Sequence, residues 1–147
     1  MALTLQPVLD AVLSEAKDLR RAEGLQDAVV LVRVDYNVPI FNGKVAEYFR
    51  VDSSLPTIHL LQQKGAKVVL LAHLGRPKPE EMSQAHLRKN FSLSILGAHL
   101  QKALGRSFVG VCGATVGPAA ERAVHALQAG QVREHHLGAR KGLLPPG

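Results

Sequence analysis

Apolar residues recur along this chain with two spacings, one typical of helices and one typical of buried strands. Near the N-terminus they repeat at helical intervals, which predicts an amphipathic helix over residues 7–21 that stops at Gly24. Its polar face mixes acids with bases, which favours a packing helix over a membrane-surface helix. Residues 29–34 and 67–72 are instead nearly unbroken aliphatic runs. Such runs are typical of strands that are buried on both faces of a parallel sheet.

The remaining pattern alternates helices with strands. Ser53 or Ser54 can cap a helix that carries Leu55, Ile58 and Leu61 and stops at Gly65. Further along, the pattern predicts a polar loop over residues 77–90, a helix over 93–104, a strand over 107–112 and a helix over 118–129. This order predicts an α/β protein with an open parallel sheet and crossover helices, a Rossmann-like arrangement of three layers. From residue 133 no periodicity remains, so we expect one domain over residues 1–132 and a disordered tail over 133–147.

Composition narrows the class of protein. The 147 residues suit one domain, and no apolar run is long enough to span a membrane. The N-terminus resembles neither a secretory signal nor a transit peptide, so we expect a cytoplasmic protein. The formal charge of +6 attracts anions, but no block of Lys and Arg predicts a nucleic-acid partner. Cys112 stands alone, which rules out an internal disulfide.

Candidate chemistry lies directly after the first two predicted strands. Ligands of open parallel sheets bind beyond the carboxyl ends of the strands. Asp35 and Asn37 follow the first strand and can hold a hydroxyl group, whereas His73, Gly75 and Arg76 follow the second. An imidazole, an exposed main-chain amide and a guanidinium together suit a carboxylate or phosphate. The alternative is that these are ordinary turn residues and solvated charges.

Arg50 lies in the loop before the next helix and is a further cation for the same crevice. Three other candidates are weaker. Gly110, Gly113 and Gly117 precede a helix but match no phosphate-binding motif, so a turn is the better interpretation. His135 and His136 are adjacent and point apart in an extended chain, which disfavours a metal site. Cys112 is expected in the core.

Several segments, taken in their order along the chain, resemble one known family. They are Val30-Leu31-Val32-Arg33-Val34-Asp35-Tyr36-Asn37-Val38-Pro39, Asn42-Gly43-Lys44, Arg50 with Leu55-Pro56-Thr57-Ile58, the long segment from Lys64 through His73-Leu74-Gly75-Arg76 to Lys78, Phe91-Ser92-Leu93 and Gly117-Pro118. On these motifs, the chain is identified as a member of the phosphoglycerate kinase family. The likeness covers residues 29–132 and implies part of that family's N-terminal, phosphoglycerate-binding domain.

The resemblance implies a glycolytic transferase, a kinase that converts 1,3-bisphosphoglycerate and ADP to 3-phosphoglycerate and ATP. It implies substrate binding by Asp35, Tyr36, Asn37, Arg50, His73, Leu74, Gly75 and Arg76, with Arg50 as the catalytic residue that stabilises the transferring phosphoryl group. The family is monomeric, and its ATP-binding and Mg²⁺-binding groups lie on a nucleotide-binding half that these residues do not include. We therefore expect no cofactor, no metal, no nucleic-acid partner and no membrane partner for this chain.

Departures from the family pattern limit the expected activity. Tyr48-Phe49 replaces an acidic or small polar pair before Arg50, and Gly113-Ala114-Thr115 stands where the family often has Asp. After residue 132 the family continues with an apolar strand and a Glu-Asn-x-Arg-Phe motif, which this chain lacks. We expect a truncated chain that is inactive alone; the alternatives are a non-catalytic module that binds anionic metabolites and a non-functional fragment. We also expect an exposed sheet edge.

Overall fold

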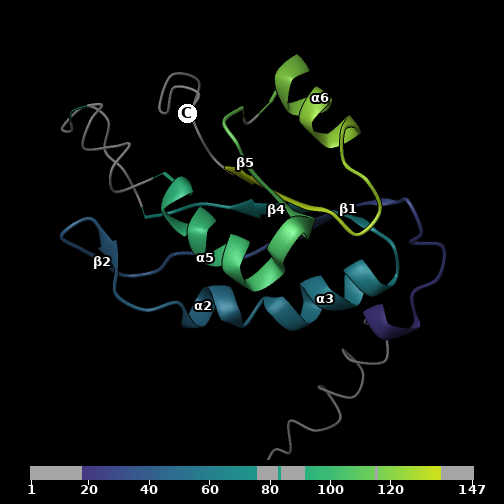
Figure 1. The fold of residues 1–147 in the computed structure, drawn as a ribbon, viewed down its shortest axis with the longest axis horizontal. Helices are drawn as coiled ribbons and strands as arrows, with labels where there is room; N and C mark the ends of the chain where they lie inside the picture. The colour runs from purple at the N-terminus through teal and green to yellow at the C-terminus, as the bar shows by residue number, and fades with distance from the viewer. Residues whose placement is uncertain (1–17, 76–82, 84–91, 115, 137–147) are drawn as a thin grey trace, which may run out of the picture.

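A parallel sheet of four strands forms the centre of the molecule (Figure 1). The computed structural model describes residues 18–75, 83, 92–114 and 116–136. Across the sheet the order is β1, β4, β6, β5, and every neighbouring pair is parallel. The four strands are Val29–Arg33, Lys67–Ala72, Val132–His136 and Phe108–Cys112. The predicted α/β class, with an open parallel sheet and crossover helices, is thereby confirmed.

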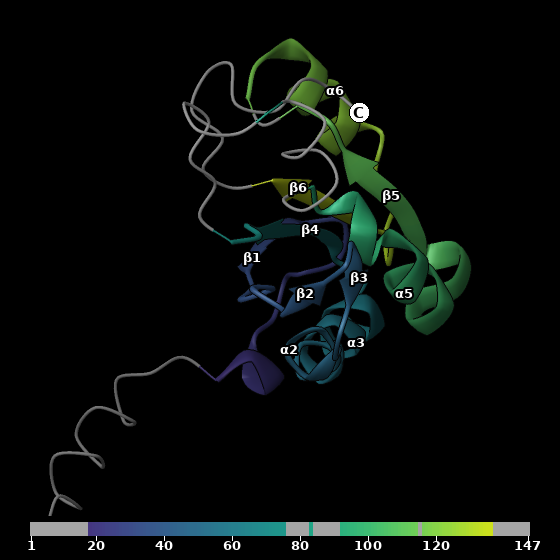
Figure 2. The same cartoon turned by 90° about the vertical axis from the view of Figure 1, so that its left-hand side faces the viewer.

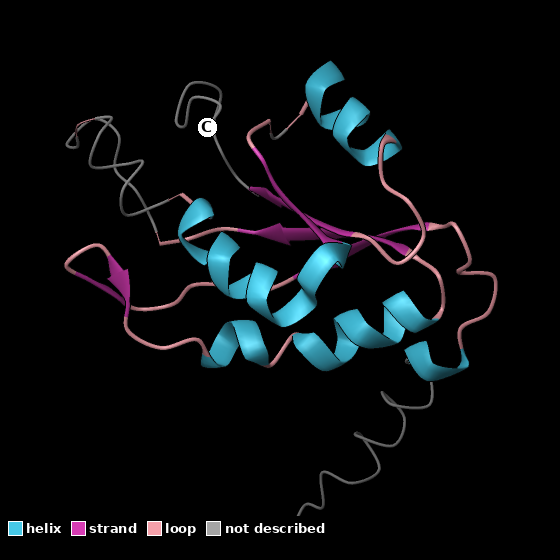
Figure 3. Cartoon of the chain, viewed as in Figure 1, coloured by secondary structure: helices cyan, strands magenta, loops and turns pink. Residues whose placement is uncertain are grey.

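Helices cover the two faces of the sheet unequally (Figures 1 and 3). On one face lie α2 (Phe49–Asp52), α3 (Leu55–Gln63) and α5 (Ser94–Leu104), whereas α6 (Pro118–His125) lies on the other. Short 3₁₀ turns, η1 (Leu19–Arg21) and η2 (Gly105–Ser107), flank these elements. The main core forms between α3, α5 and the sheet and contains Ile58, Leu61, Leu96, Leu100, Val68, Leu70 and Val132. Val69, Cys112, Ala120 and Leu127 are buried outside this cluster.

Several predicted boundaries agree with the structure. The strand expected over 67–72 is β4, and the helix expected over 93–104 is α5. Glycines end the helices as expected, because Gly65 and Gly105 adopt positive φ angles of 72° and 61°. The last predicted helix is shorter than expected, since α6 ends at His125. Ser54 does precede α3, but its side chain makes no capping hydrogen bond.

The first strand is not buried on both faces as predicted. Along β1, Val29 is 47% exposed and Leu31 is 63% exposed. The reason is its position, because among the described strands β1 lies at the edge of the sheet and pairs only with β4 (Figure 2). Side chains alternate along a strand, so Val30 and Val32 pack against the core while Val29 and Leu31 face the other way. The expected exposed sheet edge is therefore present.

The predicted start of the disordered tail at residue 133 is also wrong. Residues 133–136 belong to β6, which lies between β4 and β5 and pairs with both. Two main-chain hydrogen bonds place the start of β6 beside β4: Gly130 N–H donates to Ala66 O, and Val68 N–H donates to Gln131 O. Hydrogen bonds to β4 and β5 satisfy the main-chain N–H and C=O groups of β6, although every side chain of this strand after Val132 is polar. The rest of the expected tail lies outside the described residues.

The segments around β1 contain one feature that the pattern did not predict. Asn42 and Gly43 form the turn of a small antiparallel hairpin, β2 (Ile40–Phe41) and β3 (Lys44–Val45), with positive φ angles of 51° and 72°. Such angles are typical of two-residue hairpin turns. Of the helix expected over residues 7–21, the described part is η1. The loop expected over 77–90 lies outside the described residues except for Ser83.

Candidate functional site

The loops after β1 and β4 meet at one edge of the sheet. Because the two strands are parallel neighbours, their carboxyl ends lie side by side. Asn37 links the loops, since its Oδ1 accepts a hydrogen bond of 3.0 Å from the main-chain N–H of Gly75. The same Asn37 donates its own N–H to Asp35 Oδ1 at 3.1 Å. The sequence-based expectation that these two segments face one crevice agrees with this arrangement.

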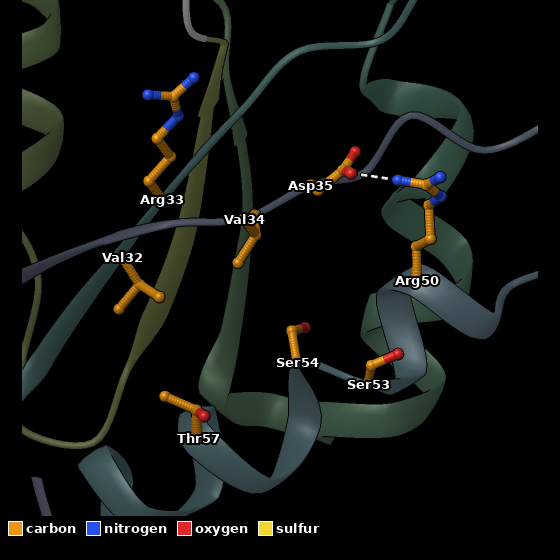
Figure 4. Close-up of a pocket in the computed structure, with 8 residues that line it drawn as sticks. All are labelled: Val32, Arg33, Val34, Asp35, Arg50, Ser53, Ser54 and Thr57. Carbon is orange, nitrogen blue, oxygen red and sulfur yellow. Dashed lines mark hydrogen bonds and ion pairs between the residues drawn. The ribbon is translucent and has the colours of Figure 1, made fainter. Parts of the chain in front are cut away.

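Arg50 reaches the same place from the short helix α2. Its Nη1 forms a hydrogen-bonded ion pair with Oδ2 of Asp35 (Figure 4). The two side chains are 47% and 62% exposed, so solvent and small ligands can reach both. At this exposure the ion pair itself adds little to stability. Its importance lies in geometry, because it holds a guanidinium and a carboxylate together at the mouth of the crevice.

Two hollows flank Asp35. One, of about 410 Å³, is bounded by Arg50 and by the hydroxyl side chains Ser53, Ser54 and Thr57 (Figure 4). The other, of about 430 Å³, is lined by Asn37 and His73. Arg33, Val34 and Asp35 line both hollows. The predicted residues Asp35, Asn37, Arg50 and His73 thus line two hollows that share one wall.

Two of the predicted site residues turn their side chains inward. Tyr36 and Leu74 are 0% and 2% exposed and belong to the core, which leaves only their main chains near the crevice. The Tyr36 hydroxyl lies 2.7 Å from Ser54 Oγ, and burial raises the pKa of that phenol to about 12. Since Ser54 Oγ donates its hydrogen to Val51 O, the phenol is the donor in this pair. Arg76 lies outside the described residues.

Sequence reasoning missed Arg33. This residue ends β1 and lines both hollows, which brings a second arginine side chain to this edge of the sheet. A signal was present, because Arg33 interrupts an apolar run at the carboxyl end of a strand, where parallel sheets hold their ligands.

The weaker candidates contribute nothing to this crevice. Gly117 precedes α6 with a φ angle of 90°, as expected for a turn. Cys112 is buried, and its Sγ donates to Ala114 O at 3.3 Å. Within the described ranges, no three His, Cys, Asp or Glu residues are grouped to hold a metal ion. Mg²⁺ prefers several oxygen ligands, and among the described residues the two hollows offer one carboxylate, Asp35, which is already paired with Arg50. These described residues therefore do not fit Mg²⁺ or Mg-ATP.

Glu134 and His135 on β6 are unusual because they are buried. Glu134 is 0% exposed, neither of its carboxyl oxygens has a hydrogen-bond partner, and burial raises its pKa to about 8. His135 is 4% exposed, and burial, with a smaller effect of Arg133, lowers its pKa. These groups lie in the interior of the sheet rather than in the crevice. In the part of the chain that the structure describes, no helix is long and apolar enough to cross a membrane.

Comparison with known proteins gives a family match. The phosphoglycerate kinase family model matches residues 19–133. Phosphoglycerate kinase of Caulobacter vibrioides is 49% identical over 105 residues, which cover 69% of this chain and 24% of the relative. That of Cereibacter sphaeroides is 44% identical over 108 residues, covering 74% and 26%. The chain thus spans about a quarter of the length of the curated relatives it matches.

Solved structures give the same result. Phosphoglycerate kinase from Pyrococcus horikoshii aligns with a TM-score of 0.61 at 26% identity, and the enzyme from Coxiella burnetii aligns with a TM-score of 0.57 at 29% identity. Each alignment covers 76% of this chain and 25% of the solved chain. Sequence motifs, strand arrangement and the matched range agree, and the chain belongs to the phosphoglycerate kinase family.

Proposed function

We propose that this chain supplies part of the phosphoglycerate site of a phosphoglycerate kinase. Such an enzyme transfers a phosphoryl group between 1,3-bisphosphoglycerate and ADP, giving 3-phosphoglycerate and ATP. The observation that supports the proposal is the cluster at the carboxyl ends of β1 and β4. There Arg50 and Asp35 form an ion pair, and Arg33, Asn37 and His73 line the hollow beside Asp35.

The cluster matches the chemistry of the proposed ligand. Phosphoglycerate carries a phosphate, a carboxylate and a free hydroxyl group. The hydroxyl can donate to Asp35, while the guanidinium of Arg50 can form paired hydrogen bonds with phosphate or carboxylate oxygens. In the structure Arg50 is paired with Asp35. We propose that the ligand inserts between these two side chains and replaces one charge-assisted contact with two.

The binding proposal is tested by calorimetric titration of the chain with 3-phosphoglycerate. A charge-assisted hydrogen bond contributes about 1.5–3 kcal/mol, so Arg50→Ala should weaken binding roughly ten- to hundredfold. Arg122→Ala is a matched control, since Arg122 is exposed on α6 at the other face of the sheet. Equal affinities of the two variants would contradict the proposed role of Arg50. No heat of binding for the unmodified chain would contradict the site itself.

We further propose that these 147 residues alone bind phosphoglycerate without transferring a phosphoryl group. The described crevice does not suit Mg-ATP, and phosphoryl transfer needs the nucleotide and metal held in line with the acceptor. A coupled spectrophotometric assay for ATP formation from 1,3-bisphosphoglycerate and ADP should give only the background rate. Turnover that rises with the concentration of the chain would refute this.

A more general anion-binding module is the second candidate. It is favoured by the open, exposed ion pair of Arg50 and Asp35, which any small phosphorylated acid can reach. Inorganic phosphate distinguishes the two candidates. A phosphoglycerate site should prefer 3-phosphoglycerate to phosphate by at least tenfold, because the hydroxyl and carboxylate add contacts. Equal affinities would favour the general module.

A further inference from the structure

Arg50 is carried by a very short helix. The four residues of α2 include one buried anchor, Val51, whereas Phe49 is 75% exposed. A helix of this length does not persist by itself, because forming its first turn fixes several dihedral angles for a single hydrogen bond. Tyr48, at the N-terminal end of α2, makes no side-chain capping hydrogen bond. The direction in which Arg50 points therefore depends on contacts from outside α2.

One side chain of α5 contacts both ends of this helix. The imidazole of His99 stacks on the phenol ring of Tyr48, with ring centroids 3.8 Å apart and planes inclined by 3°. The same imidazole forms a hydrogen bond of 2.6 Å between its Nε2 and Oδ1 of Asp52, the last residue of α2. A carboxylate only accepts hydrogen bonds, so Nε2 carries the hydrogen.

The part of α5 that carries His99 is anchored in the core. Leu96, three residues before His99, and Leu100, the residue after it, are both fully buried. The His99 side chain itself is only 24% exposed. Contact at Tyr48 and at Asp52 leaves α2 little freedom to rotate about its single buried anchor, Val51. Rotation about that anchor is the motion that would carry Arg50 away from Asp35.

We propose that His99 is a positioning residue for Arg50. Through Tyr48 and Asp52 it holds α2 in the orientation in which the Arg50 guanidinium meets Asp35 at the crevice. Tyr48 belongs to the Tyr48-Phe49 pair, which is one of the places where the sequence departs from the family pattern. The importance of Arg50 for ligand binding rests on the proposed function, whereas its placement by His99 does not.

The ligand-free test follows the Nε–Hε signal of Arg50 by heteronuclear NMR in the whole chain. His99→Ala should move this signal toward that of a free arginine side chain, as Asp35→Ala should. His125→Ala is the control, because His125 is an exposed histidine of α6 on the other face of the sheet. It should leave the signal in place. His99→Phe keeps a ring for stacking and loses the bond to Asp52, so an intermediate shift is expected. An unmoved Arg50 signal in His99→Ala would overturn the proposal.

The second test is a double-mutant cycle on the affinity for 3-phosphoglycerate. His99→Ala should weaken binding about two- to tenfold when Arg50 is present, the effect of one ordinary hydrogen bond. In an Arg50→Ala background it should have no further effect, because a positioning residue acts only through the group it positions. A full effect in that background would overturn the proposal. If the unmodified chain binds no 3-phosphoglycerate, the proposed function fails while the NMR result still decides the role of His99.

Discussion

Glu134 should make the stability of this protein fall as the solution becomes alkaline. The residue lies on β6 between two other strands, is 0% exposed, and has no hydrogen-bond partner for either carboxyl oxygen. Burial raises its pKa from the ordinary value of 4.5 to about 8. The folded protein therefore binds this proton more tightly than the unfolded chain does. The associated stability is fully present below pH 4.5 and is lost as the pH rises through about 8.

The size of the effect follows from the two pKa values. Ionising Glu134 in the folded state costs roughly 5 kcal/mol relative to ionising it in the unfolded chain. His135 complicates the acidic range, because its lowered pKa makes stability fall as the pH drops below the ordinary histidine value of 6.5. From pH 6.5 to pH 8 the change of Glu134 dominates, because the remaining effect of His135 has the opposite sign and is below about 0.5 kcal/mol. There the free energy of unfolding should decrease by about 1–1.5 kcal/mol.

Urea denaturation at pH 6.5 and pH 8 measures this change. The variant Glu134→Gln keeps the shape of the side chain but cannot ionise, so its free energy of unfolding should vary by less than about 0.5 kcal/mol between the two conditions. Glu121→Gln on the exposed surface of α6 is the control and should behave as the unmodified chain. The same decrease in Glu134→Gln and in the unmodified chain would refute the assignment to Glu134.

Three further predictions concern the frame around the crevice. Leu31→Lys on the edge strand should change stability by less than about 0.5 kcal/mol, because this side chain is 63% exposed, and light scattering should detect less self-association; unchanged association would contradict a role for the β1 edge. Tyr36→Phe should lower the free energy of unfolding by about 0.5 kcal/mol, the lower end for a hydrogen bond, because Ser54 keeps its bond to Val51; a loss above about 2 kcal/mol would show that the phenol has another role. Gly65→Ala should cost about 1–2 kcal/mol in urea denaturation, since φ is 72° there, and a neutral result would contradict the assigned conformation.

Local sequence patterns predicted a strand correctly where its side chains are apolar and buried in the middle of the sheet. β4 was predicted with its observed bounds, because residues 67–72 are aliphatic, lie in the middle of the sheet and follow the helix-ending Gly65. β1 has a similar composition, yet its side chains Val29 and Leu31 are exposed. A run of aliphatic residues does not indicate whether a strand lies at the edge or in the middle of a sheet. β6 was missed for the opposite reason. Arg133 and Glu134 are polar, and the strand conformation there comes from main-chain pairing with β4 and β5.

The candidate site was predictable to a similar extent. Asp35, Asn37 and His73 could be placed at one edge of the sheet because the ends of parallel strands converge. The ion pair between Arg50 and Asp35, and the support of α2 by His99, could not be predicted. Both depend on a helix of four residues, which is too short to show a period of 3.6 residues. Such contacts are set by how α5 packs, a property of the whole core.

The place of β6 in the sheet also dictates an order of assembly. β1 and β4 can pair as soon as residue 72 has been made, and both are close in sequence. Among the strands that the structure describes, β5 has no neighbour in the sheet except β6. Residues 108–112 must therefore wait, as an unpaired apolar strand, until residues 132–136 enter between β4 and β5. During synthesis this interval exposes Phe108 and Val111 to other nascent chains. This exposure therefore ends only when the largely polar segment 132–136 has entered the sheet.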